Sequence, residues 1–144
     1  MIILDNQKAT EAIENVLDHS KVGVLSTAYN NKPNSRYMVF YNDGHTLYTK
    51  TSIESKKIAE LKDNPKAHVL IGYDETNNRS FLEIDANVEI LKDQETIDWI
   101  WNKQDKSFFD SKDDPNLCVI KVIPKSIKIM NDKKLDAPQT ITFD

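Results

Sequence analysis

Glycine is scarce in this chain of 144 residues, which contains only Gly23, Gly44 and Gly72. A dinucleotide-binding G-x-G-x-x-G loop and a P-loop both need closely spaced glycines. Three isolated glycines can build neither loop. The sequence therefore excludes the nucleotide chemistry that depends on those motifs.

Cysteine is nearly absent, and the few histidines are scattered. Cys118 has no partner for an intramolecular disulfide, and it lies in an apolar run at 117–120 that is typical of a buried strand. His19, His45 and His68 belong to no H-E-x-x-H or Cys/His pattern, so we expect no metal site. We expect His45 in a hairpin turn and His68 at the start of a strand. No G-x-S-x-G motif indicates nucleophilic catalysis.

Long apolar runs and concentrated basic charge are also missing. No stretch approaches the roughly 20 apolar residues of a membrane-spanning helix, and residues 1–11 do not resemble a signal peptide. The net charge is −4, and lysines alternate with acidic residues along the chain. We therefore expect a cytoplasmic protein with no membrane and no nucleic-acid partner.

The apolar residues that are present predict helices and strands in one domain spanning residues 1–144. Helical spacing at 6–18 predicts an amphipathic helix that covers one face or end of a barrel. Strands are predicted at 22–27 and 67–73, and the first should pair, across a turn at 30–33, with a strand that starts at Arg36.

The second half of the chain contains the clearest strand pattern. Apolar and polar residues alternate at 81–91, which predicts a half-solvated antiparallel strand. Asp93 can cap a helix, and 117–122 predicts a strand that Pro124 bends before 127–130. About six strands with few helices predict a mainly β (α+β) fold, a closed or nearly closed antiparallel β-barrel with flanking helices.

The segment from Arg36 to Pro65 is the most informative for function. Residues 36–41 and 46–49 flank the turn residues 42–45, which predicts a β-hairpin. Residues 51–54 have the spacing of a helix capping box, and the helical pattern that follows stops at Pro65.

Lys56 and Lys57 would then lie at the helix N-terminus, where free N–H groups and the helix dipole are already positive. A phosphate would relieve this repulsion by binding both lysines, Arg36 from the strand, and hydroxyls from Thr51, Ser52 or Ser55. The alternative is a solvated helix start whose lysines point into water.

Together these motifs resemble a known family. Arg36 with Tyr41 on a strand, a turn with Asp-Gly, Leu-Tyr-Thr at 47–49, Ser-Lys-Lys at 55–57 and a closing Asn-Pro are similar to pyridoxamine 5'-phosphate oxidase-like FMN-binding split barrels. Trp101, then Ser-Phe-Phe at 107–109, Lys-Asp-Asp-Pro at 112–115 and a closing strand at 117–124 resemble the general stress protein 26 branch. The resemblance covers about residues 5–131.

The resemblance implies a six-stranded antiparallel split β-barrel with flanking helices, and a bound FMN. The strand that contains Arg36, Tyr37, Met38 and Val39 would lie along the isoalloxazine ring, with backbone contacts from Met38 and Val39. The other implied flavin contacts are Tyr48, Thr49, Lys56 and Lys57, with Thr51 and Ser55 as further candidates. Without the resemblance, Tyr48 is equally well explained as a cross-strand aromatic residue of the hairpin.

The resemblance also implies a homodimer with the flavin at its interface. Trp101, Phe108 and Phe109 would then close over the flavin, stack on substrate, or pack the dimer. Of these roles we favour dimer packing, because large aromatic side chains dominate interface energetics.

True pyridoxamine 5'-phosphate oxidases are longer and end in an Arg-x-His segment that binds substrate phosphate. The only arginines in this chain are Arg36 and Arg79, and neither belongs to such a segment. We therefore do not expect vitamin B6 oxidation. Met130 also stands where the general stress relatives tend to have tryptophan.

We expect an FMN-dependent oxidoreductase of unknown substrate, with a reduced nicotinamide as a candidate electron donor. The alternatives are a non-catalytic flavin-storage stress protein, or a split barrel that uses F420 or haem. No histidine belongs to a haem motif, and the glutamate tail of F420 would need more basic residues than the predicted phosphate site offers.

Overall fold

The computed structural model describes residues 2–76, 80–103, 109–136 and 138–143. Its elements are α1 (Ile2–His19), β1 (Val22–Tyr29), β2 (Lys32–Val39), β3 (Tyr41–Asp43), β4 (Thr46–Ser52), α2 (Lys56–Asp63), β5 (Lys66–Ile71), β6 (Phe81–Leu91), α3 (Gln94–Lys103), β7 (Leu117–Met130) and β8 (Gln139–Thr142). The strands form one antiparallel sheet in the order β2-β1-β5-β6-β7-β4-β3, and β8 pairs with β7.

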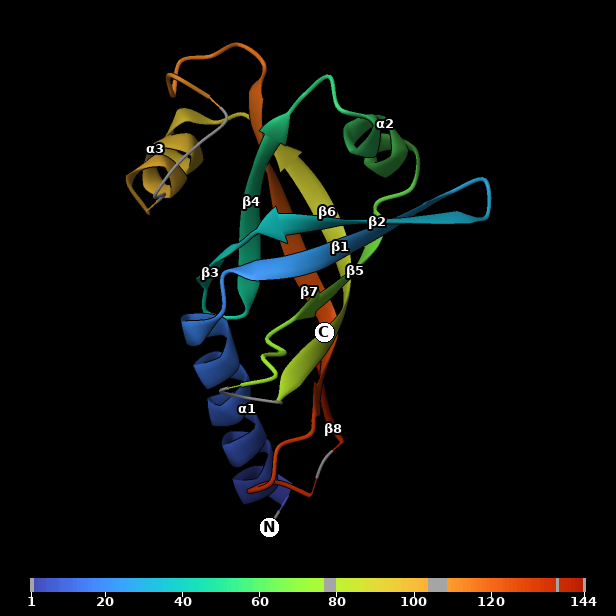
Figure 1. Cartoon of the computed structure of the whole chain (residues 1–144), viewed down its shortest axis with the longest axis vertical. Coiled ribbons are helices and arrows are strands. Elements are labelled where there is room, and N and C mark those ends of the chain that lie inside the picture. The colour runs from blue at the N-terminus through green and yellow to red at the C-terminus, as the bar shows by residue number, and fades with distance from the viewer. Residues whose placement is uncertain (1, 77–79, 104–108, 137, 144) are drawn as a thin grey trace.

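The sheet curls so that β2 approaches β4, which gives the split barrel that the sequence predicts. The prediction of six strands misses the short strands β3 and β8. Helices α2 and α3 lie at one end of the sheet and α1 at the other (Figure 1). Among the described residues, none of the helices is long and apolar enough to cross a membrane.

The core lies between the sheet and α1, where Ile13, Val16 and Leu17 are buried. Helix α1 begins at Ile2, earlier than the predicted start at residue 6. The predicted alternation in β6 is confirmed, because Leu82, Ile84, Ala86 and Val88 are buried. Cys118 is also fully buried, as expected.

Strand β7 is continuous through Pro124. The register against β6 pairs Ala86 with Pro124 and Asp85 with Ser126, so Lys125 is left unpaired in a bulge. A bulge accommodates proline inside a ladder because the proline has no N–H to donate. The predicted bend is therefore a bulge within one strand and not a break between two.

The hairpin that joins β1 and β2 turns at Asn30 and Asn31, with φ values of 50° and 63°. Two successive residues at positive φ are characteristic of a type I′ turn, which asparagine tolerates well. The turn is thus tighter than predicted, since Lys32 and Pro33 already belong to β2. Pro33 is accommodated because β2 is an edge strand.

The predicted hairpin from 36 to 49 is wrong in its first strand. Strand β2 ends at Val39, the Phe40 N–H donates to the Lys21 carbonyl, and Phe40 is buried in the core. The following strand, β3, forms the hairpin with β4, in which Tyr41 pairs with Tyr48. Arg36 therefore lies on a strand that pairs with β1 and not with β4.

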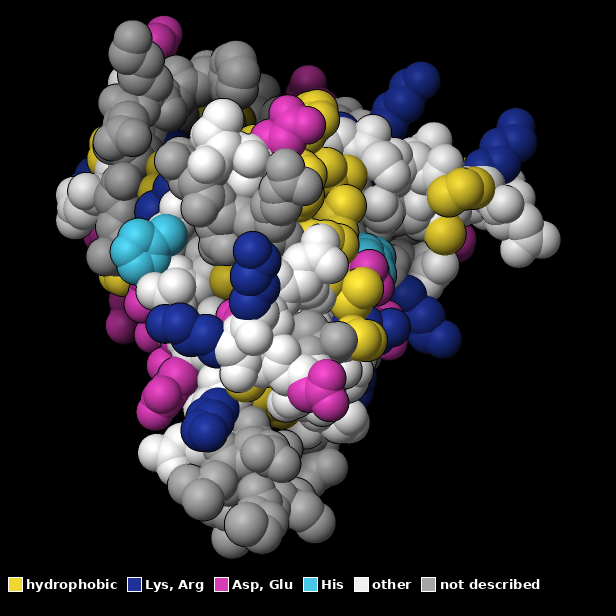
Figure 2. All heavy atoms as spheres, turned by 60° about the horizontal axis from the view of Figure 1, so that its bottom comes forward, with side chains coloured by type: hydrophobic (Ala, Val, Ile, Leu, Met, Phe, Trp, Pro, Cys, Tyr) yellow, Lys and Arg dark blue, Asp and Glu magenta, His cyan; other side chains and the backbone are white. Residues whose placement is uncertain are grey.

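Helix α3 packs on the outer side of β4 and β7 around Ile97 and Ile100. Its predicted cap is confirmed, because the Thr96 N–H donates a 3.1 Å hydrogen bond to Asp93 Oδ2. On the face shown in Figure 2, Lys and Arg side chains are interspersed with Asp and Glu.

Candidate functional site

Helix α2 starts without a side-chain cap. Its N-cap residue is Ser55, which has extended backbone and makes no side-chain capping hydrogen bond, and its first turn contains no acidic residue. The predicted capping box is wrong, because Thr51 and Ser52 are still paired in the ladder between β4 and β7. Lys56 and Lys57 are consequently the first two helical residues, at the positive end of the helix dipole.

Lys57 is half-buried at this helix start. Its Nζ donates a 2.9 Å hydrogen bond to Thr51 Oγ1 at the end of β4, and the hydroxyls of Thr51 and Ser55 lie 3.4 Å apart. Burial lowers the pKa of the Lys57 ammonium, and the nearby positive charge of Arg36 lowers it further. Two cations thus approach one another beside an uncapped helix N-terminus.

Arg36 reaches this corner from β2 and is held by several acceptors. Its Nη1 donates to Thr27 Oγ1 at 2.9 Å and to the Leu25 carbonyl at 3.2 Å. Its Nη2 lies 3.4 Å from the carboxylate of Glu60, which projects from α2. The guanidinium is therefore fixed in place by β1, and α2 supplies an acidic neighbour.

The structure brings together four residues of the predicted phosphate site, Arg36, Thr51, Ser55 and Lys57, from β2, β4 and the start of α2. Lys56 is exposed at the same helix start. We call these five residues the anion site.

The residues predicted to contact the flavin ring are distributed over two strands. Tyr37 and Val39 are exposed on β2, whereas the Met38 side chain packs against the main core. On β4, Thr49 is buried, while the Tyr48 ring packs edge-on against Trp99 of α3 with centroids 5.0 Å apart. Because successive strand residues face opposite sides, the side chains of Tyr48 and Thr49 cannot both contact one ligand from the same side of β4.

Trp101 and Phe109 lie on the α3 side of β4, away from Thr51 and Lys57. Both are half-buried in a second apolar cluster, and Lys50 Nζ lies 5.3 Å from the centroid of the Trp101 ring. Lys50 Nζ is buried and has no hydrogen-bond acceptor in the described part of the chain, and burial lowers its pKa. Phe108 lies outside the described residues.

Sequence reasoning missed Lys50 and the residues that surround Arg36, namely Thr27, Asn34 and Glu60. Glu60 follows Lys57 by one helical turn, so the helix periodicity could have placed both on one side of α2. Its partners are 24 to 33 positions away along the chain, and local patterns do not reveal such pairs.

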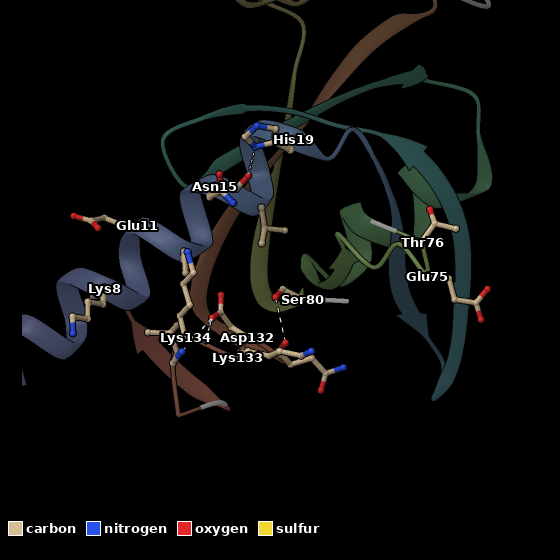
Figure 3. Close-up of a pocket in the computed structure, with 14 residues that line it drawn as sticks. Lys8, Glu11, Asn15, His19, Glu75, Thr76, Ser80, Asp132, Lys133 and Lys134 are labelled. Atoms are coloured by element: carbon tan, nitrogen blue, oxygen red, sulfur yellow. Dashed lines mark hydrogen bonds between the residues drawn. The ribbon is translucent and has the colours of Figure 1, made fainter. Parts of the chain in front are cut away.

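A large open pocket lies elsewhere, against α1. It has a volume of about 1160 Å³ and is lined by α1, residues 75–76, Ser80 and residues 131–135. Figure 3 shows that Lys8 and Lys134 share this region with Glu11 and Asp132, so its charges are mixed. Among the described residues, no cluster of His, Cys, Asp or Glu could hold a metal ion.

Comparison with known proteins identifies the family. The family model described as pyridoxamine 5'-phosphate oxidase matches residues 9–131, which include every residue of the anion site. The chain belongs to the pyridoxamine 5'-phosphate oxidase family. General stress protein 26 of Bacillus subtilis (strain 168) is 41% identical over 129 residues, which cover 89% of this chain and 92% of that protein.

Solved structures of the pyridoxamine 5'-phosphate oxidase family agree with this assignment. General stress protein 26 from Bacillus anthracis str. Sterne superposes with a TM-score of 0.81 at 30% identity, covering 94% of this chain and 98% of that one. A putative pyridoxamine 5'-phosphate oxidase from Listeria innocua superposes with a TM-score of 0.77 at 36% identity, covering 86% and 99%. The predicted family and its general stress protein branch are thereby confirmed.

Proposed function

We propose that this protein is a cytoplasmic homodimeric FMN-binding protein and acts as a flavin-dependent oxidoreductase. The observation that carries the proposal is the convergence of Arg36 and Lys57 beside the uncapped start of α2. Structural neighbours with under 25% identity include an FMN-binding protein from Nostoc punctiforme, an F420 reductase and a heme binding protein from Mycobacterium smegmatis. The fold therefore accommodates several cofactors, and the site must distinguish them.

The residues present fit a flavin phosphate. Lys57 has a lowered pKa because it is buried near Arg36, and a phosphate would stabilise its charged form. The free N–H groups of the first turn of α2 and the hydroxyls of Thr51 and Ser55 would donate to phosphate oxygens. Lys57 would exchange its bond to Thr51 for a charge-assisted bond to phosphate.

The β2 strand would position the ring next to this phosphate site. It is an edge strand that approaches β4, and only one of its sides pairs with a neighbour. The backbone groups of Met38 and Val39 would hydrogen-bond to the ring edge, as the family resemblance implies. Bound FMN would supply the electron-transfer chemistry, while the protein would bind, orient and shield the ring.

A second copy of the chain would cover the outer face of β2, β1 and β5. Val22, Tyr37, Val39 and Leu70 are all exposed on these strands, and Tyr37 is 79% exposed. The register places Val22 opposite Val39, and Val24 opposite both Tyr37 and Leu70, so these side chains form one continuous apolar face. An apolar face that includes the ring-binding strand is suited to a dimer interface at the flavin.

Flavin titration tests the cofactor assignment. The flavin-stripped protein should bind FMN saturably and riboflavin much more weakly, because riboflavin lacks the phosphate. FAD provides a second comparison. Absence of saturable FMN binding would refute the proposal.

Turnover distinguishes the oxidoreductase from the storage alternative. The FMN-loaded protein should oxidise a reduced nicotinamide in the presence of an electron acceptor. Tight FMN binding without reduction by any of a broad set of donors would favour flavin storage.

A further inference from the structure

The Glu60 carboxylate is the centre of a hydrogen-bond network that joins α2 to the β1–β2 hairpin. Oε1 accepts a 2.8 Å bond from Thr27 Oγ1, and Oε2 accepts a 2.8 Å bond from Asn34 Nδ2. Arg36 Nη2 lies 3.4 Å from Oε1. Three positions on two strands therefore hold this carboxylate in one place.

The position of Glu60 changes the charge of the anion site. Its side chain is only 15% exposed and that of Arg36 is 24% exposed, so bulk water screens their interaction incompletely. Arg36, Lys56 and Lys57 contribute three positive charges to the anion site, and the negative charge of Glu60 offsets one of them. A phosphate monoester carries about −1.5 to −2 charges near neutral pH and is attracted by the remaining net positive charge and by the helix start.

A ligand whose tail carries further negative groups beyond the phosphate would also meet the negative electrostatic potential of Glu60. Glu60 follows Lys57 by one helical turn, so a further negative group placed along α2 beyond the first turn meets the Glu60 carboxylate. Like charges brought together in a partly buried place are costly, and such repulsion is a common way to reject a wrong ligand. F420, whose phosphate-bearing tail carries added glutamates, is a ligand of this kind.

We propose that Glu60 is a specificity-determining residue of the anion site, which admits a ligand that ends in one phosphate and rejects ligands whose tail continues with further anionic groups. This inference rests on the proposed function, because it presumes that the anion site binds a flavin phosphate. A carboxylate at this position would explain why this split barrel binds FMN in preference to a polyanionic deazaflavin.

Glu60→Gln tests the inference, because the amide has nearly the same shape. Its oxygen can still accept from Thr27 and Arg36, and its NH2 group can donate to Asn34 Oδ1 if the Asn34 amide rotates. The wild-type and variant proteins are titrated with FMN, riboflavin and F420 at low and high salt. In Glu60→Gln, F420 affinity should rise by about tenfold or more, which corresponds to about 1.4 kcal/mol. FMN affinity should rise by less, and riboflavin affinity should not change.

The salt dependence of F420 affinity distinguishes an electrostatic effect of Glu60→Gln from a structural one. The gain in F420 affinity should shrink at high salt, because ions screen the removed repulsion. The matched control is Asp63→Asn, which removes the same charge from an exposed position at the other end of α2. That variant should retain the wild-type preference for FMN over F420.

Two results would overturn the inference. An unchanged ratio of FMN to F420 affinity in Glu60→Gln would show that the carboxylate does not select the ligand. A parallel loss of all three ligands would show that Glu60 only maintains the fold of the site.

A separate measurement tests the role of Glu60 if the proposed flavin binding is itself wrong. If the wild-type protein binds no flavin, thermal stabilisation by inorganic phosphate and pyrophosphate replaces the titration. Glu60→Gln should then increase the stabilisation by pyrophosphate more than that by phosphate. Equal effects on the two anions would refute the role of Glu60.

Discussion

Lys57 donates a 2.9 Å hydrogen bond to Thr51, and this bond joins the first turn of α2 to the end of β4. Neither residue is placed there by a helix cap, since the Ser55 side chain makes no capping bond. The pair instead leaves a cation and a hydroxyl together at a helix N-terminus, near Arg36.

Lys57→Ala should weaken FMN binding by about 1.5 to 3 kcal/mol, or roughly 10- to 150-fold, the range for a hydrogen bond to a charged group. Riboflavin binding should change little, because riboflavin has no phosphate. Calorimetric titration of the wild-type and variant proteins measures both constants. Lys62→Ala, in the last turn of the same helix, is the matched control. Unchanged FMN affinity in Lys57→Ala, Lys56→Ala and Arg36→Ala would remove the site assignment.

FMN affinity should fall at alkaline pH. The protonated Lys57 ammonium is the form that binds phosphate, and burial and Arg36 hold its pKa below the ordinary value. As pH rises through this lowered pKa, the free protein loses the charge and the Kd for FMN increases. Bound phosphate favours the charged form, so the Kd stops rising only above the higher pKa of the complex.

Lys57→Arg tests this assignment, because arginine remains charged throughout the range. The variant should show a flatter pH profile for FMN, and riboflavin provides the correction for titration of the flavin itself. Identical profiles for wild-type protein and Lys57→Arg would exclude Lys57 as the titrating group.

Several features that sequence reasoning predicted correctly depend on local patterns. The alternation at 81–91 defines β6 because its apolar residues must share one buried face. The Asp93 cap is visible because the carboxylate bonds to Thr96, only three residues later. Cys118 lies within an apolar run, and its burial follows from that run.

The features that sequence reasoning missed depend on contacts between distant segments. The residues at 51–54 have the pattern of a capping box, but Thr51 pairs with Cys118 in the β4–β7 ladder, so the helix starts later. Glu60 resembles any exposed helical glutamate until β1 and β2 pack against it. The sequence thus predicted the cations of the anion site, but it did not predict the Glu60 carboxylate beside them.

Lys50→Met should raise the free energy of unfolding by an amount on the order of 1 kcal/mol. The Lys50 ammonium is buried without a hydrogen-bond acceptor among the described residues, and contact with the Trp101 ring offsets only part of its lost hydration. Methionine retains the apolar stem and removes the charge. Urea denaturation near neutral pH measures the difference, with the exposed Lys66→Met as control.

The pH dependence of this difference provides a second check. The pKa of Lys50 is lowered in the folded state, so its unfavourable contribution is present at neutral pH and declines as pH rises through that pKa toward the ordinary value of 10.5. The advantage of Lys50→Met should therefore shrink at alkaline pH. A variant that is less stable than the wild type at neutral pH would show that Lys50 has a favourable partner.

Val39→Asp should convert the proposed dimer into monomers without unfolding the chain. The Val39 side chain is exposed in the isolated chain and lies opposite Val22 on the outer face of the sheet, so aspartate disturbs no core contact. A charge in an apolar interface should weaken dimerisation by roughly tenfold or more. Sedimentation velocity measures the association, and circular dichroism verifies the fold.

Lys125→Asp, at the exposed bulge of β7, is the control and should remain dimeric. If FMN lies at the interface, Val39→Asp should also lose FMN affinity, whereas a dimeric Val39→Asp would place the interface on another face.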